Sequence, residues 1–215
     1  MKRRKFIKKG ILSTIGLSFL SGLYAWQIEP FWLEFVNIKM PIKNLPEKLI
    51  GKKLMQISDL HVGDRFDWNY LIKSFKKAQK LNPDFVVYTG DFISYNKKQF
   101  EKLITVMKNA VIGKYTTVGV LGNHDYGKKW SQNNVADRIV EILKTSGIQV
   151  LRNEYVNVKG LNIIGLDDFW GTNFQPKKVL SKVNINNANI ILCHNPDVCD
   201  LDIWGDYNSW ILSGH

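Results

Sequence analysis

The most informative segment of the chain is residues 53–61, which read Lys-Leu-Met-Gln-Ile-Ser-Asp-Leu-His. A short apolar run that is bounded by polar residues predicts a β-strand, here over residues 53–58. Asp59 and His61 come directly after it, and both side chains can bind a metal ion. The segment therefore predicts a buried strand with a candidate ligand pair at its carboxyl end.

Similar apolar runs, which alternate with helical patterns, follow this segment along the chain. The predicted strands at 53–58, 85–89 and 116–121 alternate with predicted helices at 68–81, 98–111 and 135–146. Strand, helix, strand at this spacing predicts a parallel sheet with crossover helices. Closer strands at 149–151, 155–158 and 161–166, with Lys159-Gly160 as a tight turn, predict antiparallel pairing. Two more strands, at 189–193 and 210–213, and a short helix near 198–204 complete a mixed sheet system of the layered α/β class.

The composition indicates a folded globular domain with its positive charge concentrated at one end. The chain has 215 residues, of which 45% are hydrophobic and 23% charged, and a net charge of +11. Six of its 30 basic residues lie in the first nine positions, which leaves 24 basic against 19 acidic residues in the rest. No basic run interleaved with aromatics follows, which argues against nucleic acid as a partner. Cys193 and Cys199 are either two buried thiols or one bridge.

Residues 10–28 carry no charge and predict a membrane-active segment. At ~1.5 Å per residue they span about 28 Å, which suits a signal-peptide core or a short anchor. Cleavage after Ala25 would put Leu23 where a small residue is preferred. We therefore favour an uncleaved anchor, with Trp26 and Trp32 near the membrane interface.

The basic cluster before this segment has two interpretations. Residues 3–8, Arg-Arg-Lys-Phe-Ile-Lys, resemble a twin-arginine export signal, although Lys2 stands where that signal has Ser or Thr. The alternative is an ordinary Lys-rich flank on the cytoplasmic side of an anchor. Both put the folded body on the extracytoplasmic side of the cell membrane. We expect a signal or anchor at 1–28, a linker at 29–51 with one edge strand at 35–38, and a folded domain at 52–215.

Polar side chains follow five of the predicted strands, and all four histidines of the chain are among them. These residues are Asp59, His61, Asp91, Asn123, His124, Asp125, His194 and His215. Because the carboxyl ends of parallel strands form the crevice in which α/β sheets bind ligands, we expect these side chains to converge. Asp59 and His61 are two positions apart, so on an extended backbone they point to the same side. Gly90, Gly122 and Gly214 let the chain turn sharply out of the strands.

A metal ion explains this cluster better than chance placement does. Each residue taken singly is more easily a turn residue or a hydrogen-bonded histidine. Together, however, Asp59, Asp91 and Asp125 beside neutral imidazoles would repel one another unless a cation lay among them. Carboxylate, imidazole and amide oxygen without thiolate suit Mn, Fe or Zn. Asp91, alone after its strand, is well suited to bridge two ions.

Five motifs stand in order along the chain: Asp59-Leu60-His61, Gly90-Asp91, Gly122-Asn123-His124-Asp125, His194 and Gly214-His215. Together they resemble the calcineurin-like metallophosphoesterases, from residue 54 to the carboxyl terminus. The resemblance implies a four-layer αββα sandwich and a phosphoester hydrolase with two divalent metal ions. Carried over by position, it implies that Asp59 and His61 hold the first metal, that Asp91 bridges, and that Asn123, His194 and His215 hold the second. It also implies that Asn123 and His124 bind the substrate, and that His124 is catalytic and assists the leaving group.

Two further segments narrow the resemblance, Gly165-Leu166-Asp167-Asp168-Phe169-Trp170 and Cys193-His194-Asn195-Pro196-Asp197. With the amino-terminal segment, they are similar to the exported or membrane-associated bacterial phosphodiesterases that include the UDP-2,3-diacylglucosamine diphosphatase type. Asp167 and Asp168 either belong to the site or end an ordinary strand.

Two departures from the family pattern affect the site. Ser94 stands where many relatives have the second Asp of Gly-Asp-x-x-Asp, which would loosen the support of the catalytic histidine. The family continues Gly-His-x-His, whereas this sequence stops at His215. Either the sequence is truncated, so that the carboxyl-terminal part of the domain is missing, or the first metal site lacks one ligand.

The expected chemistry is metal-dependent hydrolysis of a phosphodiester or pyrophosphate. Such a group is anionic and repels hydroxide, so two cations must both neutralise it and create hydroxide near neutral pH. His124 as an imidazolium would stabilise the departing oxygen. The anchor favours a lipid-linked or nucleotide-sugar substrate over other small phosphoesters. The alternative is a degenerate, catalytically weak binding module that is tethered to the membrane.

Overall fold

The computed structural model describes residues 3–63, 67–94 and 99–215. Met1 and Lys2 of the predicted leader, and Lys98 at the start of a predicted helix, lie outside the described residues. The chain divides into two compact units, Met1–Lys39 and Met40–His215.

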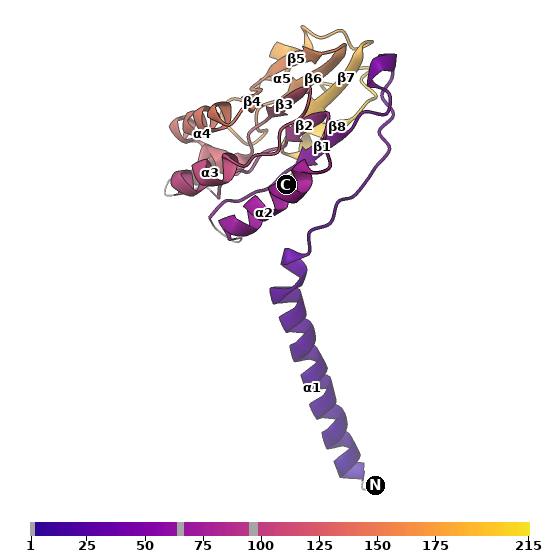
Figure 1. Cartoon of the computed structure of the whole chain (residues 1–215), viewed down its shortest axis with the longest axis vertical. Coiled ribbons are helices and arrows are strands. Elements are labelled where there is room, and N and C mark those ends of the chain that lie inside the picture. Colours follow the sequence, from indigo (N-terminus) through magenta and orange to yellow (C-terminus); the bar gives the residue numbers. More distant parts are fainter. Residues whose placement is uncertain (1–2, 64–66, 95–98) are drawn as a thin grey trace. The chain divides into compact units, whose positions relative to one another are not determined.

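The first unit contains one long helix. α1 covers Arg3–Gln27, and a 3-10 helix, η1 (Glu29–Phe31), follows it (Figure 1). The segment is long and apolar enough to cross a membrane, a property that anchors and signal peptides share. The predicted edge strand at 35–38 is wrong. Those residues are coil, because no strand in the described part of the chain pairs with them, and Val36 and Ile38 are each 74% exposed.

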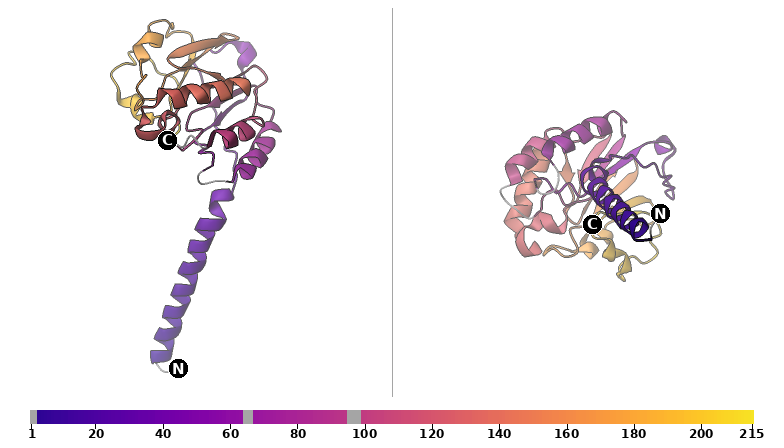
Figure 2. Two further views of the ribbon diagram at one scale, coloured as in Figure 1. Left: turned by 90° about the vertical axis from the view of Figure 1, so that its left-hand side faces the viewer. Right: turned by 90° about the horizontal axis from the view of Figure 1, so that it is seen from below.

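The second unit begins with a four-stranded parallel sheet. Its strands lie in the order β1 (Leu54–Ile57), β2 (Phe85–Tyr88), β3 (Thr116–Gly119) and β4 (Gln149–Val150). The crossovers are α2 (Trp68–Gln79), α3 (Phe100–Met107) and α4 (Asn133–Thr145), which cover one face of this sheet (Figures 1 and 2). The antiparallel pairing predicted for residues 149–151 is wrong. The crossover through α4 returns β4 to run parallel to β3.

The second sheet has the order β5 (Glu154–Val158), β6 (Leu161–Gly165), β7 (Ala188–Leu192) and β8 (Ile211–Leu212). β5 and β6 pair antiparallel, as predicted, through a turn in which Lys159 and Gly160 have φ of 54° and 93°. β6, β7 and β8 run parallel. Two short helices, α5 (Pro176–Leu180) and the 3-10 helix η6 (Pro196–Asp200), contribute to the core on the outer face. The helix predicted near 198–204 corresponds to η6, which begins earlier.

Alternating side chains divide the core into three parts. On β2, Val86 and Tyr88 pack against the helices, whereas Val87 packs between the two sheets. On β7, Ile190 points to the same inter-sheet core, and Ile191 points to the outer face. This period of two, with both faces of each sheet buried, gives four layers: helices, sheet, sheet and short outer helices. The structure thus confirms the predicted αββα sandwich.

Candidate metal centre

The loops that follow five strands meet at one edge of the sandwich. Asp59 and His61 follow β1, Asp91 follows β2, and Asn123 and His124 begin a 3-10 helix, η4 (Asn123–Tyr126), after β3. His194 and His215 come after β7 and β8 of the second sheet, with the His215 amide N–H 3.3 Å from Asp59 Oδ2. The structure therefore brings together side chains from both sheets, as the strand pattern predicts.

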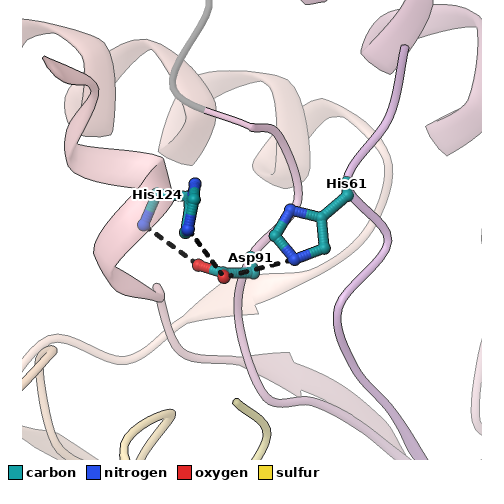
Figure 3. Close-up of side chains that lie close together, drawn as sticks. All are labelled: His61, Asp91 and His124. Atoms are coloured by element: carbon teal, nitrogen blue, oxygen red, sulfur yellow. Dashed lines mark hydrogen bonds and ion pairs between the residues drawn. The ribbon is translucent and has the colours of Figure 1, made fainter. Parts of the chain in front are cut away.

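Asp91 lies at the middle of this cluster and is 1% exposed. Its Oδ2 is 3.5 Å from Nε2 of His61, 3.3 Å from Nε2 of His194 and 4.0 Å from Nε2 of His124. Its Oδ1 accepts a hydrogen bond from the backbone N–H of His124 at 3.0 Å. Figure 3 shows the imidazoles of His61 and His124 on either side of the Asp91 carboxylate.

Among the residues that the structure describes, two groups of side chains have the spacing of a metal site. One consists of His61, Asp91 and His124, and the other of Asp91, His194 and His215. Within each group the ligand atoms lie within 4.8 Å of one another. Asp91 belongs to both, which is the position that a bridging carboxylate would occupy.

Asp59 and His61 face each other, with His61 Nε2 3.7 Å from Asp59 Oδ1. An extended backbone is expected to point both side chains to the same side, but these residues are not extended. Asp59, His61 and Asp91 have φ of 54°, 41° and 55°, a region that costs ~1–3 kcal/mol for such residues. Hydrogen bonds between the loops hold them there, from Asp59 N to Gly90 O at 3.1 Å and from His61 N to Asp91 O at 3.0 Å.

The glycines of the motifs serve two different purposes. Gly90 has φ of 97°, so it makes the sharp turn that the sequence predicts. Gly122 and Gly214 have no positive φ and are required by close approach instead. A Cβ on Gly122 would lie 2.2 Å from Asp91 Oδ1, and one on Gly214 would lie 2.6 Å from Asp59 Oδ2.

Hydrogen bonds on the far side of two imidazoles orient them. His194 Nδ1 is 2.8 Å from the carbonyl oxygen of Thr89, so Nδ1 donates and Nε2 faces Asp91. His61 Nδ1 is 2.9 Å from Ser94 Oγ. Within the described residues, Ser94 therefore contacts His61, a candidate ligand, and not His124, the predicted catalytic histidine. Such partners fix the orientation of metal-binding imidazoles.

Within the described part of the chain, buried Asn123 Oδ1 has no hydrogen-bond partner, and His194 Nε2, also without a hydrogen bond, has only the Asp91 carboxylate beside it at 3.3 Å. A buried polar atom without a partner costs ~1–3 kcal/mol. Both atoms are of the types that coordinate divalent cations, and the carboxylate of Asp91 lies beside His194. The residues present thus fit a site for divalent metal ions.

The pKa shifts of the acidic and histidine side chains also favour a bound cation. Burial raises the pKa of Asp59, but contacts with His61 and Ser58, the charge of His194 and the His215 backbone together outweigh burial and lower the pKa to about 2. Burial lowers the pKa of His194, but Asp91, the Thr89 carbonyl and Asp59 together outweigh burial and raise the pKa to about 9. The pKa of His61 is raised by its contact with Asp59. Without a cation, the carboxylates draw protons onto these imidazoles, and binding of a metal would release them.

His124 differs from the other histidines, because burial lowers its pKa despite the opposing charge of Asp91. The predicted imidazolium form of His124 is therefore not favoured by the protein alone. An anionic group next to His124 would raise the pKa again.

Asp125 is structural, although its place in the motif suggested a member of the charge cluster. It is fully buried, and its Oδ1 accepts from the N–H groups of Phe92 and Ile93 at 2.9 and 3.2 Å. Its Oδ2 accepts from Gly122 N–H at 2.9 Å. Burial and the Asp91 charge raise its pKa to about 7. Asp125 thus joins the loops after β2 and β3, a role that the sequence did not reveal.

Asp167 and Asp168 have different surroundings in the structure. Asp167 accepts from the Tyr126 hydroxyl and from Nε of the half-buried Arg152 at 2.9 Å, so it belongs to a structural network. Asp168 is fully buried and accepts from Trp170 N–H at 2.9 Å through Oδ1. Burial raises the pKa of Asp168 to about 6.

Cys193 and Cys199 are both free. Cys193 is buried but Cys199 is exposed, so the alternative of a bridge is wrong and only one of the two thiols is buried.

Comparison with known proteins identifies the family. The model of the calcineurin-like phosphoesterase family matches residues 52–215. UDP-2,3-diacylglucosamine pyrophosphatase LpxG of Chlamydia trachomatis is 28% identical over 262 residues, covering 98% of this chain and 78% of that protein. Uncharacterised metallophosphoesterases of Aquifex aeolicus and Bacillus subtilis are 30% and 29% identical, covering 93% and 92% of this chain and 75% and 70% of their own. The chain thus belongs to the calcineurin-like phosphoesterase family of metal-dependent phosphoester hydrolases.

Proposed function

We propose that this chain hydrolyses a phosphodiester or pyrophosphate bond at a centre of two divalent ions. The observation that carries the proposal is the position of Asp91, which is shared by two groups of candidate ligands. In this proposal the first ion is held by Asp59, His61 and Asp91, and the second by Asp91, Asn123, His194 and His215. Mn, Fe or Zn fits these nitrogen and oxygen ligands.

The residues around the centre have distinct roles in this reaction. When bound, the ions neutralise the phosphate and supply a hydroxide nucleophile near neutral pH. Asn123 and His124 bind the substrate phosphate. Its negative charge offsets the burial that lowers the His124 pKa, so His124 carries a proton while substrate is bound. That proton passes to the departing oxygen as the bond to phosphorus breaks.

The substrate proposal rests on the relatives and on α1. Two relatives carry the name UDP-2,3-diacylglucosamine pyrophosphatase, and α1 has the length and composition of a membrane span. A lipid-linked or nucleotide-sugar pyrophosphate at a membrane surface fits both. The basic residues at the start of α1 would stay on the cytoplasmic side, which puts the hydrolase unit on the extracytoplasmic side of the cell membrane.

Replacement of Asp91 by Asn tests the two-ion centre. The full chain is loaded with Mn²⁺, its ion content is measured by plasma mass spectrometry, and its turnover of bis-p-nitrophenyl phosphate is followed. Two ions per chain are expected for the unaltered protein, and loss of both ions and turnover for Asp91→Asn. Asp137→Asn, at an exposed ion pair with Arg152, is the matched control and should change neither.

Two results would contradict the proposal. Turnover retained by Asp91→Asn with bound metal would remove Asp91 from the centre. One ion or none in the unaltered protein, without turnover, would instead indicate the degenerate binding module.

A further inference from the structure

An aromatic pair, Trp130 and Trp170, lies next to the metal centre. The two indoles are stacked, with ring centroids 5.2 Å apart and planes 20° apart. Trp170 contacts His215 edge-on at 4.7 Å, and His215 is 5.4 Å from His194. A row of rings therefore extends from the proposed ligands of the second ion to the surface, where Trp130 is 40% exposed.

The backbone at Trp130 is strained. Lys129 and Trp130 have φ of 59° and 55°, which is rare for large side chains. A hydrogen bond from Trp130 N–H to the Gly127 carbonyl at 3.1 Å supports this loop. Backbone strain of this kind persists where the surrounding structure enforces it, and it is concentrated at functional sites. Here it keeps an indole at the surface beside the ion-binding loops instead of in the core.

A hydrogen bond also fixes the backbone at Trp170. Trp170 lies in the loop that follows β6, and its backbone N–H donates to Oδ1 of the fully buried Asp168 at 2.9 Å. Trp130 belongs to the loop that begins with Asn123 and His124. Two loops from different sheets thus supply one ring each, and the stack exists before any ligand arrives.

The charge next to the pair is positive. Lys128 and Lys129 precede Trp130 and are both exposed. An acyl chain needs apolar surface but neither parallel rings nor lysines. A planar ring that carries phosphate groups uses all three features, because its face stacks on an indole while the lysines attract the phosphates.

We propose that Trp130 and Trp170 form a subsite that stacks on the nucleobase of a nucleotide whose phosphate lies in the metal centre. The inference rests on the proposed hydrolase function and narrows its substrate class to nucleotides. Trp130 presents its outer face to the base, and Trp170 fixes the angle of Trp130 through the stack.

The test measures binding of matched ligands to the full chain with Mn²⁺ by calorimetry. Uridine 5′-monophosphate carries a base, ribose 5-phosphate has the same phosphate without one, and octyl phosphate offers apolar area without a flat ring. Trp130→Ala should weaken binding of the uridine nucleotide about 5- to 150-fold, the ratio expected from stacking of one base, and leave ribose 5-phosphate unchanged. Trp130→Phe should retain most of the difference in affinity between uridine 5′-monophosphate and ribose 5-phosphate. Tyr155→Ala, at a 41% exposed aromatic on β5, is the matched control and should retain all of it.

Three results would overturn the inference. Equal binding of the uridine nucleotide and ribose 5-phosphate to the unaltered chain would show that no base subsite exists. An equal loss for octyl phosphate in Trp130→Ala would show an apolar surface instead of a stacking one. Failure of every phosphate to bind the unaltered chain would overturn the proposed function as well, which separates that failure from the first two.

Discussion

Replacement of Asp125 tests whether one buried carboxylate joins the two loops that carry Asp91 and Asn123. The carboxylate accepts three backbone hydrogen bonds, from Phe92, Ile93 and Gly122. Each buried N–H group left without a partner costs ~1–3 kcal/mol, so Asp125→Ala should lower the free energy of unfolding by about 3–9 kcal/mol. Domains of this size are stable by only ~5–15 kcal/mol, so that variant can fail to fold.

Asp125→Asn is therefore the more informative variant. Its amide oxygen can still accept from Phe92 and Ile93, but its NH₂ faces the Gly122 N–H, so one donor loses its partner. We expect a loss of about 1–3 kcal/mol. Asp137→Asn changes an exposed ion pair with Arg152, and it should cost no more than ~1 kcal/mol.

The assay is urea unfolding of the two variants and the unaltered chain, followed by tryptophan fluorescence. EDTA is present because bound ions would stabilise the folded state by mass action. A cost for Asp125→Asn no larger than that for Asp137→Asn would refute the reasoning. So would an Ala variant as stable as the Asn variant.

Three further changes test other contacts of the site. Gly122→Ala should abolish Mn²⁺ binding in a metal titration, because its Cβ would lie 2.2 Å from Asp91 Oδ1; normal binding would contradict this. Ser94→Ala removes the hydrogen bond on His61 Nδ1 and should weaken metal affinity about 10- to 100-fold, whereas Ser94→Asp should preserve it. Iodoacetamide should modify the exposed Cys199 in the folded chain, but should modify the buried Cys193 only after unfolding. Peptide mass spectrometry would show which cysteine is modified.

Much of the fold follows from local sequence pattern. The strands at 54–57, 85–88 and 116–119 are short apolar runs between helical patterns, and such alternation requires parallel pairing. Parallel strands end at one edge, so the convergence of their polar ends follows from the same pattern. The αββα layering came from the resemblance to a known family, which the match over residues 52–215 confirms. The two-residue β4 was misassigned, because a strand this short carries no information about its partner.

Contacts between distant segments explain what sequence pattern could not show. The sequence places Asp125 and Asp91 in similar settings, yet three backbone donors from two loops make Asp125 structural. Among the described residues, Ser94 contacts His61 and not His124, because the loops after β1 and β2 lie side by side.

The order of strands and the ligand types at their ends are local properties, which apolar periodicity and residue chemistry make readable along the chain. The left-handed backbone at Asp59 and His61, and the stacking of Trp130 on Trp170, arise only in the folded protein. In each case the conformation is held by hydrogen bonds or rings from loops that are remote in sequence. No local pattern encodes such contacts, because they depend on which strands lie side by side and on how the two sheets pack.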